Sequence, residues 1–321
     1  MTRVSVTKKL IASTCGIAAA IGMGATTAEA KYPNKPIELV CSTKAGSGAA
    51  RWCQMMADEL SKPNRLGVPV NVVYKPGGAN HEGVVYTSSK PTDGYTILHI
   101  SGSHAGYFNL PHFTKGFKDF HMVARVERHL YAISVRCDDK QIKSWKDLVA
   151  VAKKKPGQLA MGSNKPGSIH HRQHIRINND QGIKLRFVPY KGTGGVVKDV
   201  VGKHLRVGFA QPGKWNPHIK AGTVCPIALL NEKRLNHPLW KNVPTIHEVG
   251  AKYKIPHQWQ GFIVKKGTSK AIIKRISDAS KDVANSKAYQ KYLAKQPHVI
   301  PLFSDDRAKL TKDFQRLLDD A

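Results

Sequence analysis

The sequence predicts an α/β protein with two α/β domains around a hinged cleft, and three observations lead to this prediction. Short apolar runs alternate with helical patterns from Lys31 onward, which favours sheets covered by helices. The strand, loop and helix order starts again after residue 131. Glycine-rich turns directly follow apolar runs, as at the carboxyl ends of strands where α/β proteins bind ligands.

The first thirty residues have the pattern of an export signal. Arg3, Lys8 and Lys9 form a positive end, Leu10–Met23 is apolar, and Ala28-Glu29-Ala30 is a small-residue cleavage site. The apolar stretch contains polar residues and glycines and is shorter than the roughly 20 residues of a spanning helix. We therefore expect an exported protein cleaved after Ala30, with 291 residues remaining of 321.

The chain is strongly basic, with a formal net charge of +29, of which +27 lies after residue 30. Such a field concentrates anions near the surface. The lysines are spread along the chain, and aromatic residues make up only 7%. A nucleic-acid module more often groups basic residues with exposed aromatics, so we expect no nucleic-acid partner.

The first structural unit begins at the apolar run PIELVCS, residues 36–42, which predicts a buried strand. A helical stripe follows, formed by Ala49, Cys53, Met56, Ala57 and Leu60. Residues 68–74 and 95–101 predict two further strands, with a helix over 82–90 between them. This βαβαβ order favours a largely parallel sheet.

A second unit starts at YAISVRC, residues 131–137. Ser144 and Asp147 form a capping-box pattern that predicts the start of a helix. Glycines at 192–195 lead into another predicted helix, over 192–202. Strands are predicted at residues 158–163, 186–190, 205–210 and 225–230. Amphipathic patterns over 272–283 and 310–318 predict helices that cover the first sheet.

This order predicts three segments: a signal peptide over 1–30, a first domain from 31–133 and 230–321, and a second domain over 134–229. No low-complexity linker separates the two domains, so strand-like crossings are expected to join them.

Four cysteines remain after the signal, and their wide spacing matches no zinc motif. Cys41 could pair with Cys53 and Cys137 with Cys225, or all four could be buried thiols. His170 and His174 could share one helix face, but the sequence supplies no third metal ligand. We expect neither a metal nor a cofactor.

The segment Lys44–Gly48 turns from a predicted strand into a predicted helix. Unpaired backbone N–H groups and the helix dipole attract an anion to such a turn. Nothing after Gly46 completes a P-loop, and Arg51 stands where a dinucleotide fingerprint needs a third glycine. The sequence therefore predicts an anion other than a nucleotide.

Over nearly the whole of residues 31–321, the chain resembles the substrate-binding proteins of tripartite tricarboxylate transporters, also called Bug proteins. The segments that carry the resemblance, in order, are YPNKPIELV, AGSG, VNVVYKPGG, PTDGYTILHIS, MGSNKPGSIHH, VPYKGTGG, VPTIHEVG and WQGFIVKKGT. The resemblance implies a type II periplasmic binding protein fold, which closes on a small carboxylate in the periplasm and delivers it to membrane permease subunits. We expect a monomer.

The resemblance also implies two facing ligand loops, Lys44–Gly48 and Gly162–Ser168, with the turn Tyr190–Gly194 beside them. Glycine and serine in these loops would present backbone N–H groups and hydroxyls, and a charge-assisted hydrogen bond contributes roughly 1.5–3 kcal/mol. The expected ligand-binding residues are Lys44, Ala45, Gly46, Ser47, Gly48, Ser163, Gly167, Ser168, His171, Tyr190, Gly192 and Gly194.

Four positions depart from the family pattern. Ala50 and Gln54 stand where the family usually has Asp and Arg, Lys165 replaces a common glycine, and Arg206 replaces a common Asp. Three of these changes remove negative charge or add positive charge, which suggests a more anionic ligand or a separate branch of specificity.

Two other functions stay open at this point. The loaded protein could signal to a membrane kinase instead of a permease. It could also be an exported enzyme, since Ser168 lies close to His171, although the sequence has no G-x-S-x-G elbow and residues three apart rarely form a nucleophile and its base. We expect no enzymatic activity.

Overall fold

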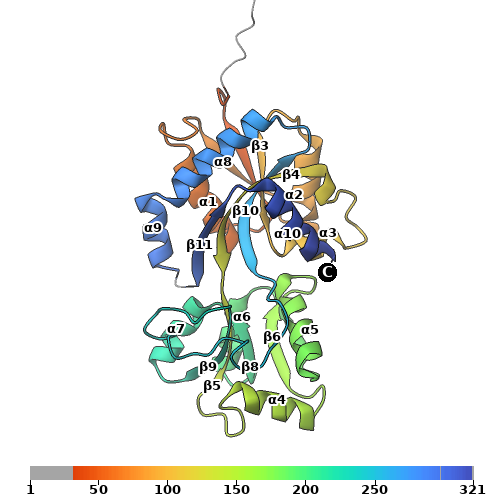
Figure 1. Ribbon diagram of the computed structural model, residues 1–321, viewed down its shortest axis with the longest axis vertical. Coiled ribbons are helices and arrows are strands. Elements are labelled where there is room, and N and C mark those ends of the chain that lie inside the picture. Colours follow the sequence, from red (N-terminus) through yellow and green to blue (C-terminus); the bar gives the residue numbers. More distant parts are fainter. Residues whose placement is uncertain (1–31, 297, 320–321) are drawn as a thin grey trace, which may run out of the picture. The chain divides into compact units, whose positions relative to one another are not determined.

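The computed structural model describes residues 32–296 and 298–319, so the predicted export signal lies outside the described residues. Within this part of the chain, the helices are all too short or too polar to cross a bilayer. Two separate mixed sheets with helices packed on them form the architecture, which confirms the predicted α/β fold class (Figure 1).

The first sheet has the strand order β11-β4-β10-β3-β1-β2. Its strands are β1 (Ile37–Cys41), β2 (Val70–Tyr74), β3 (Thr96–Ser101), β4 (Phe120–His129), β10 (Gln258–Lys265) and β11 (Val299–Ser304). Strand β1 runs parallel to β2 and β3, whereas β10 is antiparallel to β3 and β4, and β11 to β4. The prediction of a largely parallel sheet is therefore wrong outside β1–β3, because later strands join that edge in the opposite direction.

Six helices accompany the first sheet: α1 (Gly48–Leu60), α2 (His81–Ser89), α3 (His104–Phe108), α8 (Lys270–Ala284), α9 (Lys287–Ala294) and α10 (Arg307–Asp319). Short 3-10 turns occur at 78–80 and 117–119. Helices α8 and α10 pack on β4, so the two amphipathic patterns of the last third cover the first sheet as predicted. The apolar stripe of α1 is buried at Cys53, Met56, Ala57 and Leu60.

The second sheet has the order β7-β6-β8-β5-β9. Its strands are β5 (Tyr131–Arg136), β6 (Ala160–Asn164), β7 (Arg186–Tyr190), β8 (Val207–Ala210) and β9 (Val224–Leu230). Strand β6 is parallel to β7 and β8, while β5 is antiparallel to both of its neighbours. The accompanying helices are α4 (Trp145–Lys154), α5 (Ile169–Gln181), α6 (Thr193–Val201) and α7 (Pro212–Lys220). Ser144 and Asp147 form the predicted capping box at α4.

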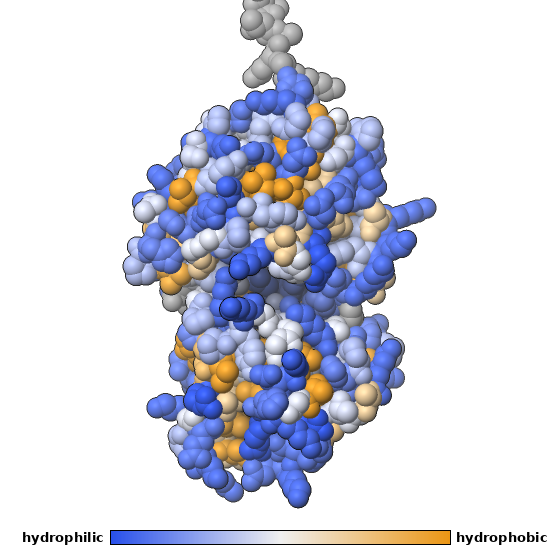
Figure 2. All heavy atoms as spheres, turned by 180° about the vertical axis from the view of Figure 1, so that it is seen from behind, coloured by the Kyte–Doolittle hydropathy of each residue, from blue (hydrophilic) through white to orange (hydrophobic). Residues whose placement is uncertain are grey.

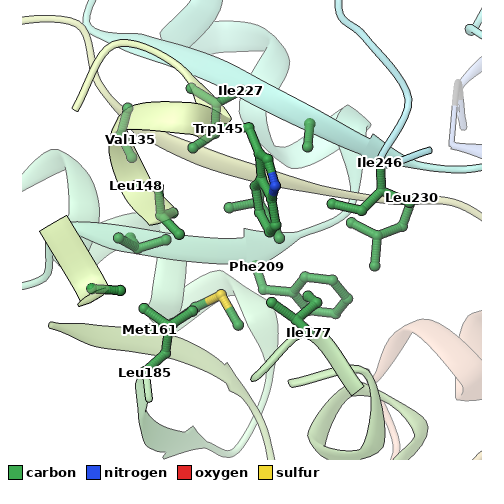
Figure 3. Packing of buried hydrophobic residues seen from close by; sticks show 14 of the residues in the cluster. Val135, Trp145, Leu148, Met161, Ile177, Leu185, Phe209, Ile227, Leu230 and Ile246 are labelled. Carbon is green, nitrogen blue, oxygen red and sulfur yellow. The ribbon is translucent and has the colours of Figure 1, made fainter. Parts of the chain in front are cut away.

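Buried apolar side chains from helices, strands and loops pack together on one face of the second sheet (Figure 3). They include Val135, Trp145, Leu148, Met161, Ile177, Leu185, Phe209, Ile227, Leu230 and Ile246. A disulfide joins Cys137 to Cys225 at the end of the β5–β9 pair, whereas Cys41 and Cys53 are free thiols. Of the pairings left open by the sequence, the structure therefore contains one.

The chain passes between the sheets twice. Only Leu130 separates β4 from β5, and the irregular segment 231–257 leads from β9 back to β10. The division into two hinged domains at residues 133/134 and 229/230 stays a prediction.

Candidate functional site

The first predicted loop connects β1 to α1, and its own side chains shape it. The Ser47 hydroxyl accepts a hydrogen bond from the backbone N–H of Ala50 at 3.1 Å and lies 2.9 Å from the Thr43 hydroxyl. Gly46 has a φ of +78°, a left-handed conformation that favours glycine. Arg51 donates to the Gly46 carbonyl at 2.6 Å. The loop is thus held in one shape, with residues 44–46 exposed at its tip.

The second predicted loop ends at the start of α5. The Ser168 hydroxyl donates to the Lys165 carbonyl at 2.6 Å and accepts from the backbone N–H of His171 at 3.3 Å. Ser168 therefore caps the helix and closes the loop. Ser163 on β6 is fully buried, and its hydroxyl has no hydrogen-bond partner among the described residues.

The third segment, between β7 and α6, leaves open space above its glycines. A Cβ added at Gly192 or Gly194 would meet no heavy atom within 4 Å. The Tyr190 hydroxyl donates to the Asp199 carboxylate at 2.6 Å. Burial, together with that carboxylate, raises the pKa of Tyr190 to about 12, so the phenol stays neutral. Room for a ligand is therefore available at the glycines, while Tyr190 braces α6.

The three histidines of α5 have separate surroundings. His171 is half-buried, accepts a hydrogen bond from the backbone N–H of Gly167 at 3.4 Å, and its ring packs at a tilt against Phe187. The His170 ring packs edge-on against Tyr131 at 4.4 Å. His174 donates from Nε2 to the Leu185 carbonyl oxygen at 2.9 Å. In the part of the chain that the structure describes, these histidines belong to no metal-ligand cluster.

Three basic side chains lie at these segments without a carboxylate partner. Lys214 on α7 donates to the Thr193 hydroxyl at 2.9 Å, and burial plus the nearby Arg51 lower its pKa. The Lys165 ammonium lies over the Tyr107 ring at 4.8 Å, and burial lowers its pKa. Within residues 32–296 and 298–319, Arg51, Lys165 and Lys214 form no ion pair. Cations without a carboxylate partner favour an anionic ligand, and Lys165 among them is half-buried.

Lys214 and Thr193 lie in this region but are not among the residues predicted from the sequence. Thr193 follows a strand in the motif KGTGG and could have been found as the first residue of a helix at the carboxyl end of a strand. No local sequence pattern predicts a role for Lys214, because it reaches Thr193 only through the packing of α6 beside α7.

The second loop also lies against the segment that follows β3. The backbone N–H of Ile169 donates to the Ser103 hydroxyl at 3.4 Å, and a Cβ at Gly106 would approach the Gly167 carbonyl oxygen to 2.0 Å. The second loop therefore contacts α3 and the residue before it, next to the first sheet. Among the described residues, the first loop forms no hydrogen bond or ion pair with the other two segments.

Two of the four side chains that depart from the family pattern have hydrogen-bond partners outside the predicted loops. Arg206 donates to the Asp139 carboxylate at 2.8 and 2.9 Å, and Gln54 donates to Asp58 at 2.8 Å. Ala50 is buried at the start of α1. Of the four departures, Lys165 alone places an unpaired charge at a predicted loop.

The surface is hollowed on the face turned away in Figure 1, and hydrophilic side chains border the hollow (Figure 2). A cavity of about 720 Å³ lies between β4 and α10, lined partly by Arg307, Lys312 and Arg316. None of the predicted loop residues lines this cavity.

Comparison with known proteins agrees with this architecture. A family model described as tripartite tricarboxylate transporter family receptor matches residues 53–315. The UPF0065 protein in the gbd 5' region of Cupriavidus necator is 30% identical over 286 residues, 86% of this chain and 84% of that protein.

Among solved structures, a TctC solute-binding protein from Polaromonas has a TM-score of 0.75 at 22% identity, covering 90% of this chain and 98% of the other. Rpa4515 of R. palustris with adipate has a TM-score of 0.74 at 21% identity, covering 90% and 95%. At these identities the two structures show a shared fold. With the family model, they lead to one conclusion: the chain belongs to the tripartite tricarboxylate transporter receptor family.

Proposed function

We propose that this chain is a periplasmic receptor that captures a small organic carboxylate and delivers it to the membrane permease of a tripartite tricarboxylate-type transporter. The observation that carries the proposal is the set of three unpaired cations, Arg51, Lys165 and Lys214, at the segments that follow β1, β6 and β8. Carboxyl ends of strands are where α/β folds bind ligands. A relative in the fold comparison holds adipate, a dicarboxylate.

In the proposed site, the carboxylate accepts hydrogen bonds from backbone N–H groups at the starts of α1 and α6. Gly48, Gly192 and Gly194 would allow this approach, because a Cβ at each position meets open space. Lys44, Ala45 and Gly46 supply the exposed edge of the first loop, and the half-buried Ser47 follows them.

The second loop contributes in two ways. His171 accepts a hydrogen bond from the backbone N–H of Gly167, and the Ser168 hydroxyl closes the loop onto the Lys165 carbonyl. Ser163 supplies a buried hydroxyl whose hydrogen-bonding capacity is unused among the described residues. Tyr190 acts on the site only through α6.

The same contacts argue against catalysis by Ser168 and His171. The serine hydroxyl donates to the Lys165 carbonyl, and the imidazole Nδ1 faces the Gly167 backbone N–H. A serine nucleophile needs its base within hydrogen-bond reach. We therefore propose binding without turnover.

Calorimetry with a panel of mono- and dicarboxylates, adipate included, tests the proposal. Lys214→Gln should weaken binding of the best carboxylate about tenfold to a hundredfold, because a charge-assisted hydrogen bond contributes roughly 1.5–3 kcal/mol. Lys184→Gln is the matched control, since Lys184 is exposed just before the amino end of β7. The proposal fails if no carboxylate binds, or if both variants bind like the parent.

Export is tested separately. We propose that the first thirty residues direct the chain to the periplasm and are removed after Ala30. Mass spectrometry of the secreted protein should then find Lys31 as its first residue, and a retained residue 1–30 segment would contradict cleavage.

A further inference from the structure

Two thiols and an imidazole from three elements meet in the interior of the first sheet's unit. Cys41 ends β1, Cys53 lies on α1, and His99 lies on β3. Their ligand atoms, two Sγ and one ring nitrogen, all lie within 4.8 Å of one another. The exposed fraction of each residue is at most 1%. This cluster lies outside the set of side chains assigned to the carboxylate.

The strand register explains why these residues meet. Val40 of β1 aligns with Leu98 of the parallel strand β3. Cys41 directly follows Val40 and His99 directly follows Leu98, so Cys41 and His99 lie next to each other on adjacent strands. Helix α1 packs on β1 and places Cys53 over both. No spacing rule in the sequence reveals the cluster, because the strand pairing and the helix packing assemble it.

A fixed hydrogen-bond chain orients the His99 ring. The Gln260 side-chain nitrogen donates to the Glu127 carboxylate at 3.0 Å, so the Gln260 oxygen faces His99 Nε2 at 2.8 Å. An amide oxygen only accepts hydrogen bonds, so His99 Nε2 carries the proton. His99 Nδ1 is left with a lone pair, and it is buried without a hydrogen-bond partner among the described residues. A hydrogen-bond partner that fixes the tautomer in this way is typical of metal-binding histidines.

Aromatic side chains lie next to His99. The Trp52 ring lies 5.3 Å from His99 and 5.1 Å from Phe262, measured between ring centroids. The Thr43 hydroxyl contacts Cys41 Sγ at 3.3 Å. In the described chain, no further His, Cys, Asp or Glu joins the three ligand atoms. The cluster thus supplies two thiols and one imidazole, all buried.

We infer that Cys41, Cys53 and His99 bind one soft metal ion that accepts three ligands, monovalent copper. Thiolate and imidazole ligands suit copper, whereas structural zinc sites have four protein ligands. On binding, the two thiols lose their protons to solvent as the copper–sulfur bonds form, and His99 binds through its existing lone pair. The oxidation state of the metal does not change.

Anaerobic titration of the purified full chain with Cu(I), in competition with bicinchoninic acid, tests the inference. We expect one Cu(I) per chain in the parent and none in Cys41→Ser or Cys53→Ser. His99→Gln should weaken Cu(I) binding at least tenfold. His174→Gln is the matched control, because His174 is equally buried but belongs to α5 beside the second sheet, and it should bind like the parent.

Copper-edge X-ray absorption on the parent protein provides a test that needs no variant, and it should find two sulfur neighbours and one nitrogen neighbour. Circular dichroism of the metal-free variants establishes that they are folded. The inference is overturned if the parent takes up no Cu(I), if Cys53→Ser retains it, or if zinc binds more tightly with four ligands. Peptide mapping that finds a Cys41–Cys53 disulfide in the isolated protein would also overturn it.

Discussion

Gly106 of α3 lies so close to the second loop that alanine cannot replace it without moving the loop. A Cβ there would lie 2.0 Å from the Gly167 carbonyl oxygen and 3.1 Å from its carbonyl carbon. Real Cβ contacts are not shorter than 3.0 Å, so the Gly167 backbone has to move by at least about 1 Å. Because Gly167 directly precedes the Ser168 cap, this movement would reach the proposed ligand loop.

Overpacking of this kind costs roughly 1–3 kcal/mol of unfolding free energy. The higher helix propensity of alanine offsets up to about 1 kcal/mol of that loss. We expect Gly106→Ala to lower the stability measured by urea denaturation, and to weaken carboxylate binding about tenfold or more in calorimetry on the folded protein.

Gly261→Ala is the matched control. Its Cβ would lie 2.2 Å from the Ala124 carbonyl oxygen, inside the first sheet and away from the second loop. We expect a comparable loss of stability with nearly unchanged affinity. Parental stability and affinity in Gly106→Ala would refute the reasoning, as would an equal loss of affinity in both variants.

Three other predictions concern stability and the glycine turn. Replacing both Cys137 and Cys225 by serine should lower the unfolding free energy by roughly 4–5 kcal/mol, because the bridge closes a segment with a sequence separation of 88; a loss below about 1 kcal/mol in urea denaturation would contradict this. Burial lowers the pKa of His170 and of His298 to about 3, so both are neutral when folded and become protonated on unfolding below pH 6.5. Above pH 6.5 the two histidines do not lower the free energy of unfolding. As the pH falls from 6.5 toward 3, each lowers it by up to about 1.4 kcal/mol per pH unit. His170→Phe should reduce the slope of unfolding free energy against pH by about one proton, and an unchanged slope would disprove the assignment. Gly194→Ala should stabilise α6 by up to about 1 kcal/mol, because nothing lies within 4 Å of the new Cβ, while weakening carboxylate binding; thermal unfolding and calorimetry on the same sample separate the two effects, and unchanged affinity would remove Gly194 from the site.

Local patterns in the sequence were enough for the α/β class, for most strands of the two units and for the capping box at Ser144. These features depend on neighbouring residues, since strand alternation and helix caps arise from contacts within a few positions. The glycine turns after β1, β6 and β7 were also visible, because a turn between a strand and a helix is a local event.

Strand direction was not visible. Strands β10 and β11 join the first sheet antiparallel after the chain has crossed to the second sheet and returned, and no local pattern reports that path. The surroundings of Ser168 were not visible either. Its hydroxyl was expected to donate to the ligand, but it already forms hydrogen bonds within the helix cap.

The sequence by itself determined the family and the fold class, and it predicted which loops hold the ligand. Only the tertiary structure decided which distant groups meet, namely Lys214 with Thr193, Gly106 with Gly167, and Cys41 with Cys53 and His99. The physical reason is that each of these contacts depends on how helices pack on sheets and on the register between strands. Those arrangements minimise the free energy of the whole chain, and a short segment of sequence carries no record of them.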